Sequence, residues 1–196
     1  IGLLTTTGAK SGQPREVPLL TTVDGEAYLV IGSNGATTLG GSSVGLSSPV
    51  DRKRFHDLRA KATAIVIGGK TFLNEPYGRA PKPLFVASRL VTPEMRAKNP
   101  DAIFKTLSPS DLAHEVISQC GTPVLVEGGL EFISTLIVDG ILDQLFLTRT
   151  TIAGDGIHLF DEALLQGFKL VSVEESKDEP RITTEEMQIN TMNNAP

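Results

Sequence analysis

The sequence predicts an α/β fold with a mostly parallel central sheet, helices on both of its faces and a closing antiparallel hairpin at the C-terminus. Two observations carry this prediction. Residues 62–67, 83–88 and 122–127 are short, apolar and without in–out alternation, which is typical of parallel strands that are covered on both faces. Helix start signals fall between these segments, so strands and helices alternate along the chain.

The helices are predicted from their start signals and from the spacing of their apolar residues. Residues 48–51 (Ser-Pro-Val-Asp) and 108–111 (Ser-Pro-Ser-Asp) share one pattern: an N-cap serine, a proline at the first helical position and an acid in the first turn. Phe55 and Leu58 then place one face of the first helix inward. A further helix over residues 129–138 is apolar almost all round, so we expect it to be largely buried.

The two ends of the chain have patterns of antiparallel strands. We predict an added β-hairpin over residues 1–26, followed by one main domain over residues 27–196. The dipeptide at 24–25, Asp-Gly, lies between two β-rich runs and predicts a hairpin turn. Residues 168–176 and 181–189 predict the closing antiparallel pair.

Composition excludes several classes of function. The formal net charge is -5 and no long basic cluster is present, so we expect no nucleic-acid partner. We expect no membrane segment and a cytoplasmic location, because no apolar run reaches the length of a span and the start does not have the pattern of a signal peptide. One cysteine and three scattered histidines predict no metal site.

Two glycine-rich junctions follow predicted strands, at residues 68–71 (Gly-Gly-Lys-Thr) and 128–129 (Gly-Gly). In a parallel sheet, ligands bind beyond the carboxyl ends of the strands. Glycine lets a phosphate approach the backbone, and the N–H groups of a following helix favour an anion. Two such junctions fit a dinucleotide, but both pairs can also serve simply to turn the chain. The pattern alone leaves both interpretations open.

Longer stretches of the chain favour the dinucleotide site over a simple chain turn. These stretches are "GSNGATT", "GLSSPVDRKRFHDLRAKATAIVIGGKT", "NEPYG", "PLFVASR", "PVLVEGGLEFISTLIVDGILDQLFLT" and "AGDGIHLF". In order and spacing, residues 27–189 resemble the reductase domain of riboflavin biosynthesis, which is fused to a deaminase in many bacteria. The resemblance implies a dihydrofolate-reductase-like fold, NADPH as cofactor and a homodimer. It also implies reduction of a 5-amino-6-(phosphoribosylamino)pyrimidinone to its ribitylamino product.

The same resemblance assigns roles to individual residues. Glu127 is expected to contact and orient the substrate, and it is the candidate catalytic residue, since no strong general acid stands out in the sequence. Ser43 and Arg59 are expected near the ribose phosphate of the substrate. The residues expected to bind NADPH are Asn34, Gly69, Thr71, Asn74, Ser88, Gly128, Gly129, Leu130, Glu131 and Phe132.

Two departures from the family pattern and the start of the chain keep other functions open. Asn34 and Asn74 stand where family members commonly carry acids, which indicates a changed substrate or a non-catalytic nucleotide-binding relative. Residues 1–36 resemble the opening of deazaflavin-dependent nitroreductases. That resemblance implies that residues 10–12 (Lys-Ser-Gly) bind a cofactor phosphate. It therefore keeps a deazaflavin- or flavin-dependent oxidoreductase open as the alternative to an NADPH-dependent reductase.

Overall fold

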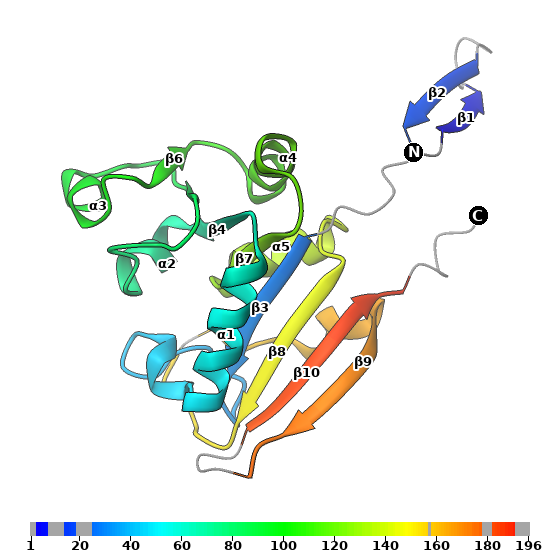
Figure 1. Ribbon diagram of the computed structural model, residues 1–196. Helices are drawn as coiled ribbons and strands as arrows, with labels where there is room; N and C mark the ends of the chain where they lie inside the picture. The colour runs from blue at the N-terminus through cyan, green and yellow to red at the C-terminus, as the bar shows by residue number, and fades with distance from the viewer. Residues whose placement is uncertain (1–2, 8–13, 19–24, 157, 178–181, 191–196) are drawn as a thin grey trace.

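The computed structural model describes residues 3–7, 14–18, 25–156, 158–177 and 182–190. Its centre is an eight-stranded sheet in the order β6-β5-β4-β7-β3-β8-β10-β9 (Figure 1). The strands are β3 (Gly25–Ile31), β4 (Ala64–Gly68), β5 (Leu84–Ala87), β6 (Ile103–Lys105), β7 (Val124–Glu127), β8 (Gln144–Thr150), β9 (Phe168–Glu175) and β10 (Ile182–Ile189). Strands β3 to β8 are parallel, and β10 is antiparallel to both β8 and β9. The predicted sheet and its closing antiparallel pair are confirmed.

Helices lie on both faces of this sheet, as predicted. They are η1 (Ser43–Leu46), α1 (Pro49–Lys61), α2 (Gly69–Asn74), α3 (Pro93–Lys98), α4 (Pro109–Cys120), α5 (Leu130–Val138) and η2 (Glu162–Gly167). Alternate residues of the three predicted apolar strands pack into different clusters. Val66 joins the cluster formed with α4 and α5, whereas Ile65 and Ile67 join that of α2 and α3. The absence of in–out alternation in the sequence therefore reflects a sheet that is covered on both sides.

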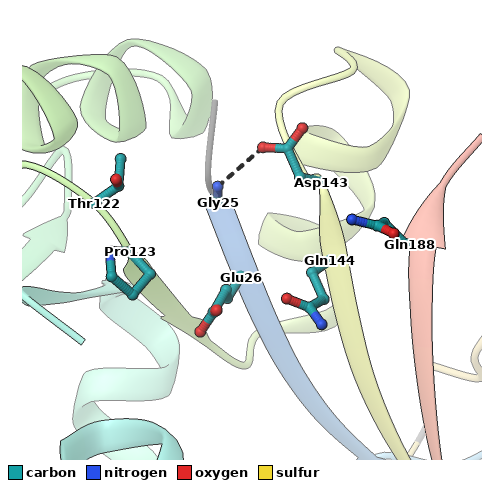
Figure 2. Close-up of a pocket in the computed structure, with 7 residues that line it drawn as sticks. All are labelled: Gly25, Glu26, Thr122, Pro123, Asp143, Gln144 and Gln188. Carbon is teal, nitrogen blue, oxygen red and sulfur yellow. Dashed lines mark hydrogen bonds between the residues drawn. The ribbon is translucent and has the colours of Figure 1, made fainter. Parts of the chain in front are cut away.

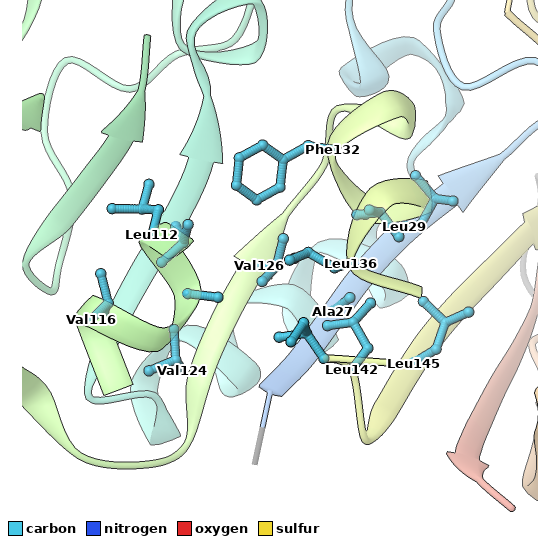
Figure 3. Packing of buried hydrophobic residues seen from close by; sticks show 14 of the residues in the cluster. Ala27, Leu29, Leu112, Val116, Val124, Val126, Phe132, Leu136, Leu142 and Leu145 are labelled. Carbon is cyan, nitrogen blue, oxygen red and sulfur yellow. The ribbon is translucent and has the colours of Figure 1, made fainter. Parts of the chain in front are cut away.

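The main hydrophobic cluster lies between the sheet and the helices α4 and α5 (Figure 3). Leu112 and Val116 of α4 and Leu136 of α5 are fully buried against strand residues such as Val124 and Val126. Burial of these side chains stabilises the folded state by about 25 cal/mol for each Å² of apolar surface that is removed from water. Phe132, Ile133 and Leu136 of α5 are buried as predicted, whereas Glu131 and Val138 near its two ends are exposed, Val138 by 75%.

The N-terminal segment corrects one prediction. Strands β1 (Leu3–Thr7) and β2 (Pro14–Pro18) form an antiparallel pair, so a hairpin exists within the predicted extension. The turn predicted at the Asp-Gly pair is wrong, because β3 begins at Gly25 and pairs in parallel with β7 on one side and β8 on the other. Burial overrides the local turn signal: Ala27 and Ile31 of β3 lie in the core at the centre of the sheet.

Both predicted helix starts are confirmed. The side chain of Ser48 accepts a hydrogen bond from the backbone N–H of Asp51, and Ser108 does the same for Asp111. Each serine satisfies one of the backbone N–H groups that a helix leaves free at its first turn. Helix α1 thereby begins at the end of the loop that follows β3, which sets its direction across the sheet.

Candidate functional site

A cavity of about 1010 Å³ opens where β4, β5 and β7 end. The residues that follow these strands, among them Gly69, Ser88 and Gly128, form part of its wall, and Phe55 and Arg59 of α1 form another part. This is the carboxyl edge of a parallel sheet, at which open α/β folds bind their ligands. The cavity therefore lies where the two glycine junctions were expected to place a ligand.

The cavity brings together nearly every residue that the resemblance assigned to the site. Its wall includes Ser43, Arg59, Gly69, Thr71, Asn74, Ser88, Glu127, Gly128, Gly129, Leu130, Glu131 and Phe132. Asn34 stands apart from these lining residues. Its amide Nδ2 donates to the carbonyl of Gly154 at 2.9 Å, and its Oδ1 accepts from the N–H of Gly154 at 3.0 Å. A carboxylate could not donate the first of these bonds, so asparagine ties two loops together here.

The most deeply held polar group of the cavity is the carboxylate of Glu127, at the end of β7. Arg59 donates from Nε to Oε1 at 2.7 Å and from Nη2 to Oε2 at 2.6 Å. The hydroxyl of Tyr77 donates to Oε2 at 2.8 Å. Glu127 is 2% exposed, so this two-pronged pair is almost entirely shielded from water. Two of the three expected substrate contacts, Arg59 and Glu127, are therefore bonded to each other.

Burial and pairing act in opposite directions on this cluster. Burial raises the pKa of the Glu127 carboxyl, against the hydrogen bonds and charge of Arg59, which lower it. Burial alone would lower the pKa of the Arg59 guanidinium, but its bonds to Glu127 outweigh that effect and raise it. The guanidinium also lies 4.2 Å from the ring centroid of Phe55 and 5.4 Å from that of Tyr77. The charge of Arg59 is thus held between two aromatic rings.

The two glycine junctions meet across the cavity. Gly128 and Gly129 both have positive φ angles, 68° and 75°, which side-chain-bearing residues rarely adopt. A Cβ atom at Gly129 would lie 2.8 Å from Oγ1 of Thr71, and one at Gly69 would lie 2.9 Å from Oγ of Ser88. These close approaches explain why both positions need glycine. Gly69, Gly129 and the first residues of α5 all line the cavity.

A second acid fixes the loop that carries Ser43. The carboxylate of Glu75 accepts from the hydroxyl of Ser42 at 2.8 Å and from the backbone N–H of Ser43 at 2.6 Å. Glu75 follows α2, so the two sides of the cavity are tied together at this point. The N–H of Ser43, which begins η1, is therefore already bonded to a carboxylate of the chain itself.

Sequence reasoning missed the group formed by Tyr28, Ser47 and Asp51. Tyr28 and Ser47 line the cavity, and the hydroxyls of both donate to Asp51, at 2.6 Å and 2.5 Å. A signal was present in the chain: Asp51, Phe55 and Arg59 recur at i, i+4 and i+8, so they share one helix face. Asp51 looked like a capping acid because its position in the first turn explains it without any other role.

A smaller cavity of about 270 Å³ lies at the opposite edge of the sheet (Figure 2). It is lined by Gly25, Glu26, Thr122, Pro123, Asp143, Gln144 and Gln188. The backbone N–H of Gly25 donates to Asp143 at 3.2 Å, which joins the starts of β3 and β8. This cavity contains none of the residues assigned to the predicted site, and it lies at the amino ends of the parallel strands.

Two properties of the described residues bear on other functions. No group of three or more histidine, cysteine, aspartate or glutamate side chains there is placed to hold a metal ion. None of the helices in the described part of the chain combines the length and the apolar character needed to cross a bilayer.

The mostly parallel sheet, its antiparallel C-terminal edge and the cavity at its carboxyl edge define an α/β protein of the dihydrofolate-reductase-like class. Residues 21–181 match the family model of the RibD C-terminal domain, and the chain belongs to that family. Residues 1–39 match a second model, that of the F420H(2)-dependent quinone reductases. Lys10, Ser11 and Gly12, which the sequence assigned to a deazaflavin phosphate, lie outside the described residues. No curated protein matches the chain.

Two solved structures share this fold. One is a diaminohydroxyphosphoribosylaminopyrimidine deaminase/5-amino-6-(5-phosphoribosylamino)uracil reductase from Thermotoga maritima, with a TM-score of 0.64 and 18% identity. The match covers 85% of this chain and 56% of that one, so this chain spans little more than half the length of the bifunctional protein. The other is the dihydrofolate reductase of Enterococcus faecalis, complexed with NADP(H) and RAB-propyl. Its TM-score is 0.65 at 18% identity, with 85% of this chain and 96% of that one covered.

Proposed function

We propose that this protein is an NADPH-dependent reductase of a small heterocyclic substrate. The observation that carries the proposal is the cavity itself: two glycine junctions face each other across it, and a buried glutamate–arginine pair closes its other side. The volume of the cavity, about 1010 Å³, lies at the upper end of the range for ligand sites, which supports a site for a cofactor and a substrate together.

The residues present fit a dinucleotide. Gly129 has a positive φ and packs so closely on Thr71 that a Cβ atom would lie 2.8 Å from its Oγ1, which joins two residues assigned to the cofactor. The first N–H groups of α5, from Leu130 to Phe132, lie beside Gly129 and carry the partial positive charge of a helix start. Ser88 lies at the end of β5, where the resemblance places the adenosine half. NADPH bound here would supply a hydride from C4 of its nicotinamide ring.

For the substrate we propose the 5-amino-6-(phosphoribosylamino)pyrimidinone of the family resemblance. Reduction at C1 of its open-chain sugar would give the ribitylamino product. Glu127 would orient the heterocycle, and Arg59 and Ser43 would lie near the phosphate. The pair with Glu127 uses Nε and Nη2 of Arg59, so Nη1 is the nitrogen proposed to contact the phosphate. Holding both reactants in one water-poor cavity is the main contribution of the protein.

A paired substitution tests the cofactor site. Gly129→Ala should weaken NADPH binding tenfold or more, because the methyl group would displace the side chain of Thr71, a proposed cofactor contact. Gly140→Ala is the matched control: Gly140 also has a positive φ, 67°, at the other end of α5, but a Cβ there meets nothing within 4 Å. Equal NADPH affinity of both variants in calorimetric titrations would contradict the site. Turnover of the phosphoribosylamino-pyrimidinone with NADPH tests the substrate.

A second candidate function rests on the N-terminal match. The 39 residues that match the F420H(2)-dependent quinone reductases favour a deazaflavin cofactor over NADPH. Absorbance titrations with NADPH and with reduced F420 separate the two candidates. Tight binding of F420 that survives Gly129→Ala would favour the deazaflavin, whereas NADPH binding without turnover would favour a non-catalytic relative.

We also propose that two copies associate through strand β9. This strand is an edge of the sheet, and Leu170, Val171 and Val173 are about half exposed, at 51%, 52% and 48%. Exposed apolar edge strands are templates for pairing with another chain. An antiparallel pairing that sets Lys169 of one protomer opposite Glu174 of its partner also sets Leu170 opposite Val173. Such a pairing is symmetric, as an interface between two identical chains must be.

Light scattering after size-exclusion chromatography tests this association. We expect a dimer for the unchanged protein and a monomer for Val173→Lys, because the new charge would face its partner across the pairing. Val138→Lys, at the exposed end of α5, is the control and should remain dimeric. A monomeric unchanged protein, or a dimeric Val173→Lys variant, would contradict the proposed interface.

A further inference from the structure

The carboxylate of Asp51 is the most completely buried charged group of the described residues, with no exposed surface. It lies in the first turn of α1 and accepts hydrogen bonds from two hydroxyls. Tyr28 donates to Oδ1 at 2.6 Å, and Ser47 donates to Oδ2 at 2.5 Å. Within the described chain, no lysine or arginine forms an ion pair with it. Hydroxyl groups and a helix start therefore offset its burial, instead of a cation.

Tyr28 and Ser47, the two residues that donate to Asp51, both line the cavity, although Asp51 itself does not. Ser47 belongs to the loop at the start of α1, and Tyr28 belongs to β3. Tyr28 is the register partner of Glu127 on the neighbouring parallel strand, so the two side chains share one face of the sheet. The ring of Phe55 lies 4.8 Å from that of Tyr28 and also contacts Arg59. The hydroxyl–carboxylate–hydroxyl group is thus adjacent to the proposed substrate position.

The proposed reaction needs a proton as well as a hydride. When a hydride adds to the carbon of a C=N or C=O bond, the heteroatom must gain a proton. Glu127 is a poor source, because its carboxylate accepts three hydrogen bonds from Arg59 and Tyr77. Tyr28 lines the cavity, and its hydroxyl is bonded to a buried carboxylate that can relay a proton from Ser47, so Tyr28 can regain a proton that it gives up.

We propose that Tyr28, Asp51 and Ser47 form a proton-transfer chain that serves the reduction, an inference that rests on the proposed function. The hydroxyl of Tyr28 gives its proton to the substrate heteroatom as the neighbouring carbon receives the hydride. A proton from water at the cavity mouth then passes through Ser47 and the Asp51 carboxylate to the oxygen of Tyr28, which restores the hydroxyl. In sum, the substrate gains one hydride and one proton, and NADPH becomes NADP⁺. Tyr28 is the catalytic residue, and Asp51 and Ser47 are positioning residues.

The environment of Tyr28 sets how this transfer proceeds. Burial, and next the negative charge of Asp51, raise the pKa of the Tyr28 hydroxyl well above its ordinary value, while the charge of Arg54 lowers it. A free phenolate is therefore disfavoured at neutral pH. The phenolate that forms when Tyr28 gives up its proton must therefore regain a proton at once, and the Asp51 carboxylate lies in hydrogen-bond contact with it to pass one on.

A ligand-free titration tests whether Asp51 controls the Tyr28 proton. The chain has two tyrosines and no tryptophan, so in a Tyr77→Phe background the phenolate absorbance reports Tyr28 alone. We expect Asp51→Asn to lower the pKa of Tyr28, because the neighbouring negative charge is lost. Asp111→Asn, at the start of α4, should leave that pKa unchanged. An unchanged titration of Tyr28 in the Asp51→Asn variant would overturn the chain.

Kinetics with NADPH and 5-amino-6-(5-phosphoribosylamino)uracil test the transfer itself. Tyr28→Phe and Asp51→Asn should lower kcat about 10²- to 10⁴-fold, the range of general acid catalysis. Their KM values and NADPH affinities should stay within about twofold of the unchanged protein, since binding groups are untouched. A loss that appears in KM instead, or an unchanged kcat, would overturn the proposal. If the unchanged protein binds NADPH but does not reduce this probe, the proposed substrate fails, and the Tyr28 titration alone then decides on the chain.

Discussion

Helices α1 and α4 begin with the same Ser-Pro-x-Asp pattern, yet their acids have different surroundings. At the start of α4, Asp111 is exposed and accepts a hydrogen bond at 2.7 Å from Ser108, its own cap. At the start of α1, Asp51 has no exposed surface and binds Tyr28 and Ser47. The backbone cap is the same in both helices, but one acid closes a local motif and the other reaches the cavity.

This difference shows that the Ser-Pro-x-Asp pattern specifies where a helix begins, but not what the acid in its first turn does. Helix α4 places Leu112, Ala113 and Val116 in the hydrophobic core, so its acid is left at the surface. Helix α1 covers the other face of the sheet and turns Asp51 and Arg59 toward polar strand residues. What lies across from the helix decides whether the first-turn acid becomes a solvated group or a buried one.

The largest effect should come from breaking the buried pair at the far end of α1. Arg59→Ala leaves the carboxylate of Glu127 buried without its cation, and we expect the free energy of unfolding to fall by about 3–5 kcal/mol. Urea denaturation measures this fall. Lys53→Ala, which removes an exposed pair on the outer side of the same helix, is the control and should change stability little.

A double variant sharpens the interpretation of Arg59. Adding Glu127→Gln to Arg59→Ala removes the uncompensated charge, so part of the lost stability should return. A double variant that is no more stable than Arg59→Ala would show that packing of the arginine between Phe55 and Tyr77, rather than its charge, supports the fold.

The next effect in size separates the two first-turn acids. Asp51→Ala leaves the hydroxyls of Tyr28 and Ser47 without their acceptor in a buried setting, which costs about 1–3 kcal/mol. Asp111→Ala removes a solvated acid at a helix start, for which about 0.3–1 kcal/mol is expected. The two values come from parallel denaturation curves. Equal losses would mean that Asp51 acts as a helix acid only.

The two cap serines should behave alike, which checks that the difference lies in the acids. Ser48→Ala and Ser108→Ala each remove the acceptor of one first-turn N–H, at a cost of about 1 kcal/mol. Thermal midpoints of the two variants should therefore fall by similar amounts. A much larger fall for Ser48→Ala would show that the cap itself, and not the acid, distinguishes the two starts.

Much of the fold could be predicted because its signals are local. Apolar runs without alternation located the central strands, and serine–proline pairs located two helix starts. The Asp-Gly signal failed because the position of β3 in the sheet is set by burial between β7 and β8, which no local pattern contains. A strand that is paired with a neighbour along both edges has no free edge for the hairpin that the dipeptide favours.

The candidate site was predicted in its backbone parts and missed in its side-chain contacts. Glycine junctions at strand ends are visible in a sequence, because glycine has a conformational reason to be there. The contacts of Glu127 with Arg59 and Tyr77 join positions far apart in the chain, so their spacing carries no signal. Asn34 was assigned to the cofactor, whereas the structure places its amide in a tie between two loops.

The smallest expected effect concerns an acid on each helix that is bonded to a lysine, and here α1 and α4 should behave alike. The hydrogen bond from Lys105 lowers the pKa of Glu115 on α4, and that from Lys53 lowers the pKa of Asp57 on α1. A group whose pKa is lowered in the folded state stabilises the fold fully when the pH is above its ordinary pKa, which is 4.5 for Glu115. This stabilisation is lost as the pH falls through the lowered pKa. We therefore expect Glu115→Gln to have a lower thermal midpoint than the unchanged protein at pH 6.5, and expect the two midpoints to converge near pH 3. Asp57→Asn should converge in the same way. A difference that persists at pH 3 would show that the glutamate side chain acts through packing, because a protonated carboxyl and an amide no longer differ in charge.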